Sequence, residues 1–338
     1  MSETNLFAQQ RKNRRRSTVL VTGFLLFFAW VGFGGDLAWY LMSVDAGPET
    51  YRHAIPFVGL LTSAVGAGMA IFAWRRGPRE VLWSTGAWEM LEPANQQERV
   101  LKNVVEEMAI ASGLPVPTIW IVPDKDPNAF ATGIDERTSH VAVTEGLLTL
   151  LDRDQLQAVV AHEMAHIQNH DVKLMTLLAA LVGVITLLSD AAHRTARVGA
   201  RVGGGKTRGS KKSKLGMVVL VLWLVTLLVA PIISRLLALT VSRNREFLAD
   251  ATAAQFTRNP SALAEALRAI EDSQAPTLAI GRGSAHLCIA DPLGRRLTHK
   301  QGRLADLLAT HPPMAMRVAR LRAMAFQYEQ TGVIPERI

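Results

Sequence analysis

Four long apolar runs dominate the pattern of hydrophobic and polar positions along the chain. Residues 18–35 form an uncharged run of 18 residues, and residues 54–74 form one of 21. Because a helix needs about 20 apolar residues to cross the roughly 30 Å hydrocarbon core of a bilayer, both runs predict membrane-spanning helices. Residues 174–189 (16 residues) are borderline, and residues 215–234 (20 residues) contain Pro231, which a membrane helix tolerates. Whether these last two runs cross the bilayer fully stays open.

Outside these runs, apolar residues recur with the periods of amphipathic helices and short strands. Residues 95–112 have helical spacing, whereas 118–122 and 141–143 have the pattern of strands. Asp152, with Gln155 at the third helical position, predicts the capped start of a helix that runs through the 160s.

Three more helices are predicted towards the carboxyl end, over 241–257, from 261 to about 271, and over 314–328. Residues 273–302 have no regular pattern. The sequence therefore predicts an α+β fold that is predominantly α, in an integral membrane protein.

The composition agrees with a membrane protein. Of the 338 residues, 49% are hydrophobic and only 20% are charged, yet Lys and Arg (37) outnumber Asp and Glu (29), which gives a net charge of +8. This balance excludes a disordered chain, and the single cysteine, Cys288, excludes an internal disulfide or a Cys-rich metal site. Because the basic residues gather beside the apolar runs, we expect a lipid bilayer as partner and no nucleic acid.

The basic residues also predict the orientation of the chain. Five of them lie within residues 11–16, the loop 43–53 holds one Arg and two acids, and Arg75, Arg76 and Arg79 follow the second run. By the positive-inside rule, the amino terminus lies in the cytoplasm, the loop outside, and the next soluble segment in the cytoplasm. A cleaved signal peptide is disfavoured, because the first run is too long and no convincing A-x-A site follows it.

A strongly basic segment, residues 190–214, separates the third and fourth runs. If both runs cross, this segment lies outside, against the positive-inside rule; if neither crosses, it lies in the cytoplasm against anionic headgroups. Only an even number of crossings keeps the two soluble segments on one side. The predicted parts are an amino-terminal tail with a two-span hairpin (1–76), two halves of one soluble domain (77–171 and 241–338), and a second apolar hairpin with the basic loop (172–240).

An H-E-x-x-H sequence occupies residues 162–166, on the helix that the Asp152 cap opens. Residues four apart on a helix have Cβ atoms about 5–6 Å apart, so His162 and His166 can each reach one Zn²⁺ at roughly 2.0–2.1 Å. Glu163 lies beside the metal and not on it, where it can accept a proton from the attacking water. The pattern therefore indicates a zinc site with a general base.

A catalytic zinc usually has three protein ligands and one open position. Asn169 and Val172 stand where an extended metzincin motif needs glycine and histidine, so the third ligand must come from elsewhere. Glu246 and Asp250 share one face of a predicted helix, so Glu246 can bind the metal while Asp250 accepts the second N–H of a zinc histidine. The alternative, that both acids are solvated partners of the neighbouring arginines, stays open at this point. The expected cofactor is one Zn²⁺ per chain.

These motifs resemble the HtpX-type membrane metallopeptidases, which belong to the gluzincin group and are related to the CAAX prenyl endopeptidases. The resemblance covers most of the chain. Besides the amino-terminal hairpin, the matching segments are 128–133 (N-A-F-A-T-G), 162–171, 245–250, 286–289 (H-L-C-I) with 292–293, and 310–313 (T-H-P-P).

The resemblance implies a gluzincin-type zincin domain that faces the cytoplasm at the cell inner membrane. It makes His162, His166 and Glu246 the zinc ligands and Glu163 the catalytic base. The implied function is proteolytic quality control in a stress response, with misfolded or damaged membrane proteins or unfolded polypeptides as substrates.

Two further roles rest on the same resemblance. Asn128, Ala129 and Phe130 match the family's edge strand, where an extended substrate can add as a further strand through backbone hydrogen bonds. His311 matches the donor that stabilises the oxyanion of the tetrahedral intermediate, and Arg317 is expected to assist it.

Other readings of the sequence remain. A CAAX-type endopeptidase would use the same zinc chemistry on prenylated carboxyl termini. A non-enzymatic membrane scaffold would bind anionic lipid through the basic loop and would need no zinc. An intramembrane protease is disfavoured, because polar and charged residues surround the H-E-x-x-H motif. The sequence leaves the substrates, the cleavage preference, the control of access to the site and the oligomeric state open.

Overall fold

The computed structural model describes residues 6–43, 55–178, 217–219, 221–223, 225, 244–273, 277–280, 287–290 and 312–334. The chain divides into two compact units. The first consists of Met1–Ser17, Arg76–Ala180 and Ala238–Ile338, and the second of Thr18–Arg75 and Leu181–Leu237. The first unit therefore draws on three separate parts of the sequence.

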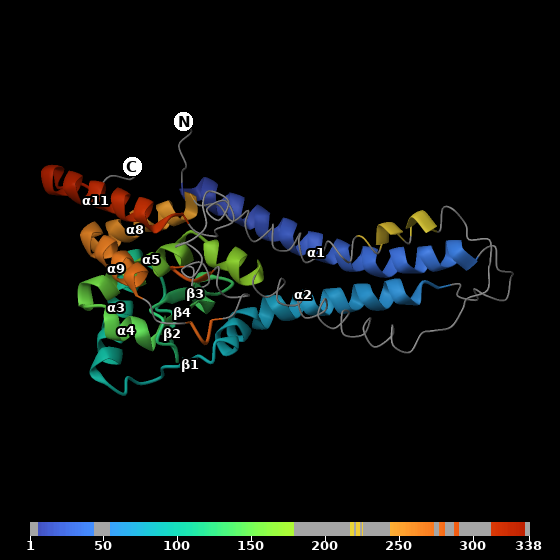
Figure 1. The fold of residues 1–338 in the computed structure, drawn as a ribbon, viewed down its shortest axis with the longest axis horizontal. Helices are drawn as coiled ribbons and strands as arrows, with labels where there is room; N and C mark the ends of the chain where they lie inside the picture. The colour runs from blue at the N-terminus through green and yellow to red at the C-terminus, as the bar shows by residue number, and fades with distance from the viewer. Residues whose placement is uncertain are drawn as a thin grey trace. The chain divides into compact units, whose positions relative to one another are not determined.

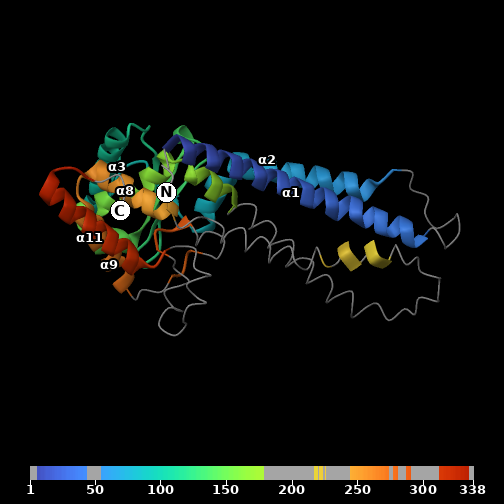
Figure 2. The same ribbon diagram turned by 90° about the horizontal axis from the view of Figure 1, so that it is seen from above.

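Two long helices, α1 (Leu6–Ser43) and α2 (Phe57–Ser84), supply most of the described second unit and run side by side in Figures 1 and 2. Asp36 Oδ2 accepts a hydrogen bond from the backbone N–H of Gly59 at 2.7 Å. A Cβ added at Gly32 would lie 2.6 Å from the Cα of Gly59, so the glycines allow the backbones to approach closely. Within the described ranges, these two helices are long and apolar enough to cross a membrane, as the first two apolar runs predict.

Helix α2 extends further than the sequence predicts. Its apolar run ends at Trp74, yet the helix continues through Pro78 to Ser84. A proline inside a helix costs about 3 kcal/mol or more. Val81 and Leu82, which are 7% and 0% exposed, are buried in a hydrophobic core of the first unit. Because burying each such side chain contributes roughly 1.5–3 kcal/mol, their packing offsets the cost of the proline. The soluble segment expected from residue 77 thus begins inside a helix.

A four-stranded mixed sheet forms the centre of the first unit. Its strands are β1 (Trp88–Glu89), β2 (Thr118–Val122), β3 (Ala129–Thr132) and β4 (His140–Thr144), in the order β1-β2-β4-β3. Strands β2 and β4 are parallel, whereas β1 and β3 pair antiparallel with their neighbours. The strands predicted over 118–122 and 141–143 are confirmed, and β3 lies at an edge of the sheet.

Both faces of this sheet are covered, so its strands are apolar at successive positions. One face contributes side chains to the main hydrophobic core together with α3, α5 and α9: Ile119, Ile121, Ala129, Ala131, Val141 and Val143. The other face packs against the end of α2 and residues 287–288 through Trp120, Val122, Phe130 and Ala142. The sheet therefore forms a layer against which helix α5 packs.

Five helices of the first unit lie at the predicted positions, whereas the short helices over 136–138 and 145–150 were not predicted. Asn95 caps α3, and Asp152 and Gln155 form the predicted capping box at the start of α5. The bounds are α3 (Gln96–Ser112), the 3₁₀ helix η2 (Glu136–Thr138), α4 (Glu145–Leu150), α5 (Arg153–Gln168), α8 (Asn244–Thr257), α9 (Pro260–Asp272) and α11 (Met314–Thr331). Helix α5 packs against α3, α8 and α9, which Figure 1 shows beside it. The described fold is α+β and predominantly helical.

Several predicted features lie outside the described residues. They are His311, the basic segment 190–214, and most of the third and fourth apolar runs. Within those two runs, residues 174–178 are helical, as are the described residues between 217 and 225.

Candidate metal centre

Helix α5 brings the two histidines of the H-E-x-x-H sequence together. His162 and His166 lie one turn apart on the same face, and their Nε2 atoms are 3.1 Å apart. His162 is fully buried, and Glu163 is 2% exposed. Burying ionisable side chains on a helix face costs free energy unless those groups have partners. The burial of these side chains therefore indicates a functional site and not a solvated surface.

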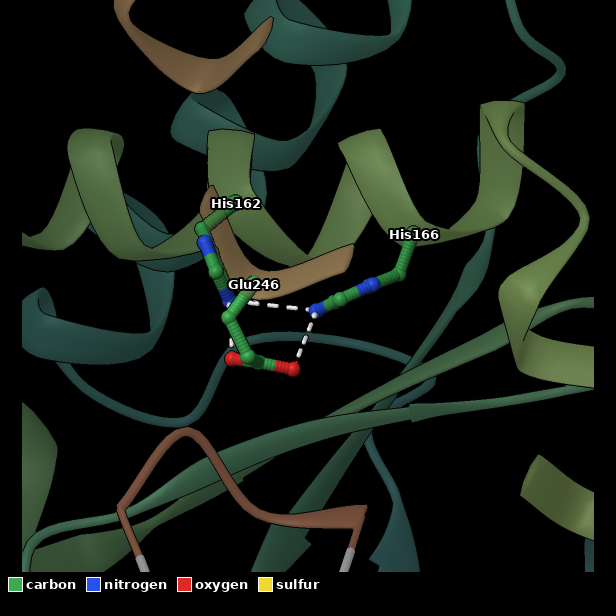
Figure 3. Close-up of side chains that lie close together, drawn as sticks. All are labelled: His162, His166 and Glu246. Carbon is green, nitrogen blue, oxygen red and sulfur yellow. Dashed lines mark hydrogen bonds and ion pairs between the residues drawn. The ribbon is translucent and has the colours of Figure 1, made fainter. Parts of the chain in front are cut away.

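Glu246, in the first turn of α8, completes the cluster. Its Oε2 lies 3.6 Å from His162 Nε2, and its Oε1 lies 3.7 Å from His166 Nε2. Figure 3 shows both imidazoles pointing from α5 towards this carboxylate. Glu246 is 5% exposed, so it is not a solvated partner of the neighbouring arginines. Glu246 follows His162 by 84 positions and His166 by 80 positions in the sequence. The packing of α8 on α5 brings the three residues together.

The spacing of these donors fits a single metal ion. Tetrahedral ligands about 2.0–2.1 Å from a zinc ion lie roughly 3.3–3.4 Å from one another. The two Nε2 atoms are 3.1 Å apart, and they lie 3.6 and 3.7 Å from the two different oxygens of Glu246. With one ligand atom taken from each residue, the three atoms lie within 4.8 Å of one another, close enough to share one ion. Among the described residues, His162, His166 and Glu246 form the group of His, Cys, Asp and Glu side chains that could hold a metal ion.

Asp250 and Arg317 contact members of the cluster and each other. Asp250 Oδ1 lies 3.0 Å from His162 Nδ1. The other ring nitrogen, Nε2, faces His166 and Glu246. The Arg317 guanidinium donates to both oxygens of Asp250, at 2.6 and 2.9 Å, and lies 3.5 Å from Glu246. Burial opposes the charged form of Asp250, but the charge and hydrogen bonds of Arg317 outweigh it and lower the pKa of this carboxyl. Asp250 is therefore an ionised acceptor for His162.

The pKa of His162 is set by opposing effects. Burial disfavours the imidazolium, but hydrogen bonds to Asp250 and Glu246 outweigh burial and raise the pKa to about 9. The metal-free ring therefore carries a proton at neutral pH, and metal binding must displace it. With the Nδ1 proton donated to Asp250, the Nε2 lone pair points towards the other two donors.

Glu163 borders a cavity next to the cluster. The same cavity is lined by His166 and Glu246, by Ala131 of β3 and by residues 287–289. Burial raises the pKa of Glu163 above its ordinary value, against the opposing charges of the nearby histidines. A carboxylate with a raised pKa at a cavity wall is suited to accept and return a proton near neutral pH.

The edge strand β3 reaches this cavity with its outer side. The backbone oxygen of Ala129 accepts a hydrogen bond from Ile289 N at 2.9 Å, and Asn128 Nδ2 donates to Ala290 O at 3.0 Å. Since backbone groups alternate in direction along an antiparallel strand, those of Ala131 face the same way as those of Ala129. The start of the outer edge is thus occupied by residues 289–290, and Ala131 lines the cavity.

The remaining sequence predictions have mixed outcomes. Arg317 is fully buried and contacts Asp250, Glu246 and the Ile289 carbonyl, which it reaches at 3.0 Å. Its direct role beside an oxyanion stays a prediction, as does the strand-pairing role of residues 128–130. His311 lies outside the described residues.

Sequence reasoning missed the groups around the other histidine. Asp171 Oδ2 lies 3.3 Å from His166 Nδ1, and its Oδ1 accepts a hydrogen bond from Asn13 Nδ2 at 2.5 Å. Arg245 lies 3.6 Å from Asp171. The only signal in the sequence was that Asp171 ends the stretch resembling a known motif, whereas Asn13 carried none.

An H-E-x-x-H helix, a glutamate from a later helix at the same cluster, and a buried carboxylate beside it define a metal-dependent peptidase. The family model "Peptidase family M48" matches residues 95–325. The chain therefore belongs to peptidase family M48, and the expected resemblance to HtpX-type peptidases is confirmed.

Relatives match over nearly the whole chain. A "Protease HtpX homolog" from Caldanaerobacter subterraneus subsp. tengcongensis is 34% identical over 328 residues, which cover 96% of this chain and 99% of that protein. A "Protease HtpX homolog" from Listeria monocytogenes serotype 4a is 35% identical over 323 residues, covering 94% of this chain and all of that protein. The crystal structure of S. mikatae Ste24p aligns with 92% of this chain and 66% of its own at 18% identity and a TM-score of 0.45, a likeness too low to define the fold.

Proposed function

We propose that the protein is a membrane-bound zinc endopeptidase of the gluzincin type, with one zinc ion held by His162, His166 and Glu246. The observation that carries this proposal is the convergence of these three side chains beside the buried Glu163: the two Nε2 atoms are 3.1 Å apart and lie 3.6 and 3.7 Å from the two oxygens of Glu246. Two imidazole nitrogens and a carboxylate oxygen are a donor set typical of catalytic zinc, which keeps a fourth position open.

When bound, zinc supplies a Lewis acid that activates water and polarises the scissile carbonyl. Glu163 takes the proton of the attacking water on its carboxylate and passes it to the leaving amine nitrogen. The raised pKa of Glu163 favours this exchange, because the carboxyl can hold the proton between the two steps. Asp250 fixes the tautomer of His162, and Arg317 keeps Asp250 and Glu246 oriented through its contacts with both carboxylates.

The substrate is proposed to bind as an extended chain along β3. Ala131 lines the cavity next to Glu163, so a strand paired there would bring a peptide bond to the metal. Asn128, Ala129 and Phe130 lead into this position, although Ala129 already pairs with Ile289. His311 is proposed to donate a hydrogen bond to the oxyanion.

We place the enzyme in the cell membrane as a multi-pass protein with its catalytic unit in the cytoplasm. The two apolar helices and the basic residues that flank them support this location. The proposed substrates are misfolded or damaged membrane proteins and unfolded polypeptides, cleaved as quality control. The naming of the relatives as HtpX homologs supports this role.

Metal analysis of Glu246→Ala tests the ligand set, with Glu265→Ala, an exposed glutamate on α9, as the matched control. The full chain in detergent is expected to bind one zinc and to cleave unfolded casein. Glu246→Ala should lose most of the zinc and the cleavage, whereas Glu265→Ala keeps both. Wild-type zinc content in Glu246→Ala would remove Glu246 from the site. A prenylated peptide assayed in parallel should not be preferred over its unprenylated form; a strong preference would support the CAAX-type reading instead.

A further inference from the structure

The first turns of helix α1 contact the residues that flank the second histidine of the metal centre. Asn13 is fully buried, although it lies only a few residues before the first apolar run. Its Nδ2 donates to Asp171 Oδ1 at 2.5 Å and to the backbone oxygen of Asn169 at 3.2 Å. Met1–Ser17 belong to the first unit, so these contacts lie within one compact body.

Asp171 connects this asparagine to the metal ligand. Its other oxygen, Oδ2, lies 3.3 Å from His166 Nδ1. A histidine that donates its Nδ1 proton to a carboxylate presents the Nε2 lone pair to a metal, and His166 Nε2 is the atom that faces His162 and Glu246. The orientation of the Asp171 carboxylate therefore sets the orientation of the His166 ring.

Asn13 also fixes the turn that carries Asp171. Helix α5 ends at Gln168, and His170 follows with a positive φ of 56° before the chain turns into the helical residues 171–178. A non-glycine residue in this conformation needs support from its surroundings. The hydrogen bond from Asn13 to the oxygen of Asn169 holds the turn at its start, while the bond to Asp171 holds it at its end.

The energetics of Asn13 favour a functional role over a purely stabilising one. Its Oδ1 is buried and has no hydrogen-bond partner among the described residues. A buried acceptor without a hydrogen bond costs about 1–3 kcal/mol of stability, so an asparagine is a poor choice at this position for stability alone. Arg245, 3.6 Å from Asp171, already balances the charge of the carboxylate. Asn13 instead fixes the orientation of the Asp171 carboxylate, because its two N–H groups bond to two fixed acceptors.

We propose that Asn13 is a positioning residue for the metal centre, acting on His166 through Asp171. This inference rests on the proposed function, because it takes His166 to be a metal ligand. The start of helix α1 is then part of the catalytic unit, so removal of the residues before the first apolar run would impair metal binding.

The test compares metal binding by variants of the full chain in detergent. Zinc affinity is measured by competition with a chelator, and the absorption spectrum of the Co²⁺-substituted protein reports the geometry of the ligands. Outer hydrogen-bond partners of metal ligands typically change metal affinity by 10–100-fold. Asn13→Ala should weaken zinc binding about 10-fold, alter the Co²⁺ spectrum and lower kcat with little change in KM. Asn103→Ala, at an exposed position of α3, is the matched control and should change none of these.

Coupling through Asp171 is tested by a double-mutant cycle. In an Asp171→Ala background, Asn13→Ala should weaken zinc binding by less than about 2-fold, because the connection is already broken. If Asn13→Ala does not fold, Asn13→Leu and Asn13→Gln replace it: Gln keeps the amide donor and should bind zinc more tightly than Leu.

The proposal is overturned if Asn13→Ala binds zinc with wild-type affinity and an unchanged Co²⁺ spectrum, if the two substitutions act independently, or if the Leu and Gln variants are alike. Glu246→Ala, included in the series, separates this failure from failure of the proposed function. Wild-type zinc affinity in that variant would refute the proposed ligand set, whereas weakened binding in Glu246→Ala beside wild-type binding in Asn13→Ala would refute the role of Asn13 alone.

Discussion

Replacing Arg317 by methionine should strongly destabilise the first unit. The guanidinium is fully buried and donates to both oxygens of Asp250, at 2.6 and 2.9 Å. It also lies 3.5 Å from Glu246 and bonds to the Ile289 carbonyl at 3.0 Å. Methionine keeps much of the side-chain length but removes the guanidinium, which leaves protonated His162 beside the two buried carboxylates in the metal-free protein.

The expected magnitude follows from the burial of these charges. Breaking a buried ion pair by removing one partner costs about 3–5 kcal/mol. For domains of 150–250 residues, 1 kcal/mol shifts the melting temperature by about 2–4 °C, so Arg317→Met should lower Tm by roughly 6–20 °C. The double variant with Asp250→Leu should lose less than the sum of the single losses, by at least about 2 kcal/mol, because no carboxylate is then left at position 250.

The assay is thermal unfolding of the metal-free full chain in detergent, followed by circular dichroism. Metal is removed so that it does not compensate for the lost cation. Arg322→Met, an exposed arginine on the same helix, is the control and should melt within about 2 °C of wild type. An equally small shift for Arg317→Met, or losses for Arg317→Met and Asp250→Leu that simply add, would refute the account of this buried pair.

Three further predictions concern other parts of the molecule. Asp250→Asn should weaken zinc binding about 10-fold in chelator competition, since His162, a proposed ligand, loses a charged acceptor; unchanged affinity would contradict this. Burial and then the charge of Arg79 lower the pKa of His140 to about 4 from 6.5, so the unfolded chain binds the extra proton. The metal-free protein should therefore lose up to about 3 kcal/mol as pH falls from about 6.5 to 4, and His140→Gln should flatten this loss in Tm measured against pH. Gly32→Ala should destabilise the α1–α2 pair by about 1–3 kcal/mol, measured by thermal aggregation in detergent, because its Cβ would meet the facing backbone at 2.6 Å, while Gly68→Ala, with nothing within 4 Å, should not.

The sequence predicted those features that local patterns encode. The spacing of His162 and His166 placed both on one helical face, and the Asp152 cap marked where that helix begins. Glu246 was predicted as the third ligand because a catalytic zinc usually has three protein ligands and the predicted helix offered an acid there, and the structure brings it to the two histidines. Its distance from the histidines could not be known, because it depends on how α8 packs against α5.

The features that sequence reasoning missed depend on long-range contacts. Asn13 and Asp171 are 158 residues apart, and no spacing rule joins an asparagine before an apolar run to a turn after a helix. The continuation of α2 through Pro78 was also missed, because local propensity ends the helix there while tertiary burial of Leu82 extends it. Arg317 was singled out in sequence, but its contacts with Asp250 became visible only in the folded unit.

Glu163→Gln tests the central claim most directly, because it changes the proposed proton acceptor and leaves the three proposed metal ligands in place. Zinc content and cleavage of unfolded casein are measured on the same purified full-length sample, with a protease-free preparation of each protein. The account predicts one zinc per chain, as in wild type, and a loss of cleavage of at least about 100-fold, in line with the contribution of a general base. Hydrolysis at the wild-type rate by zinc-loaded Glu163→Gln would contradict it.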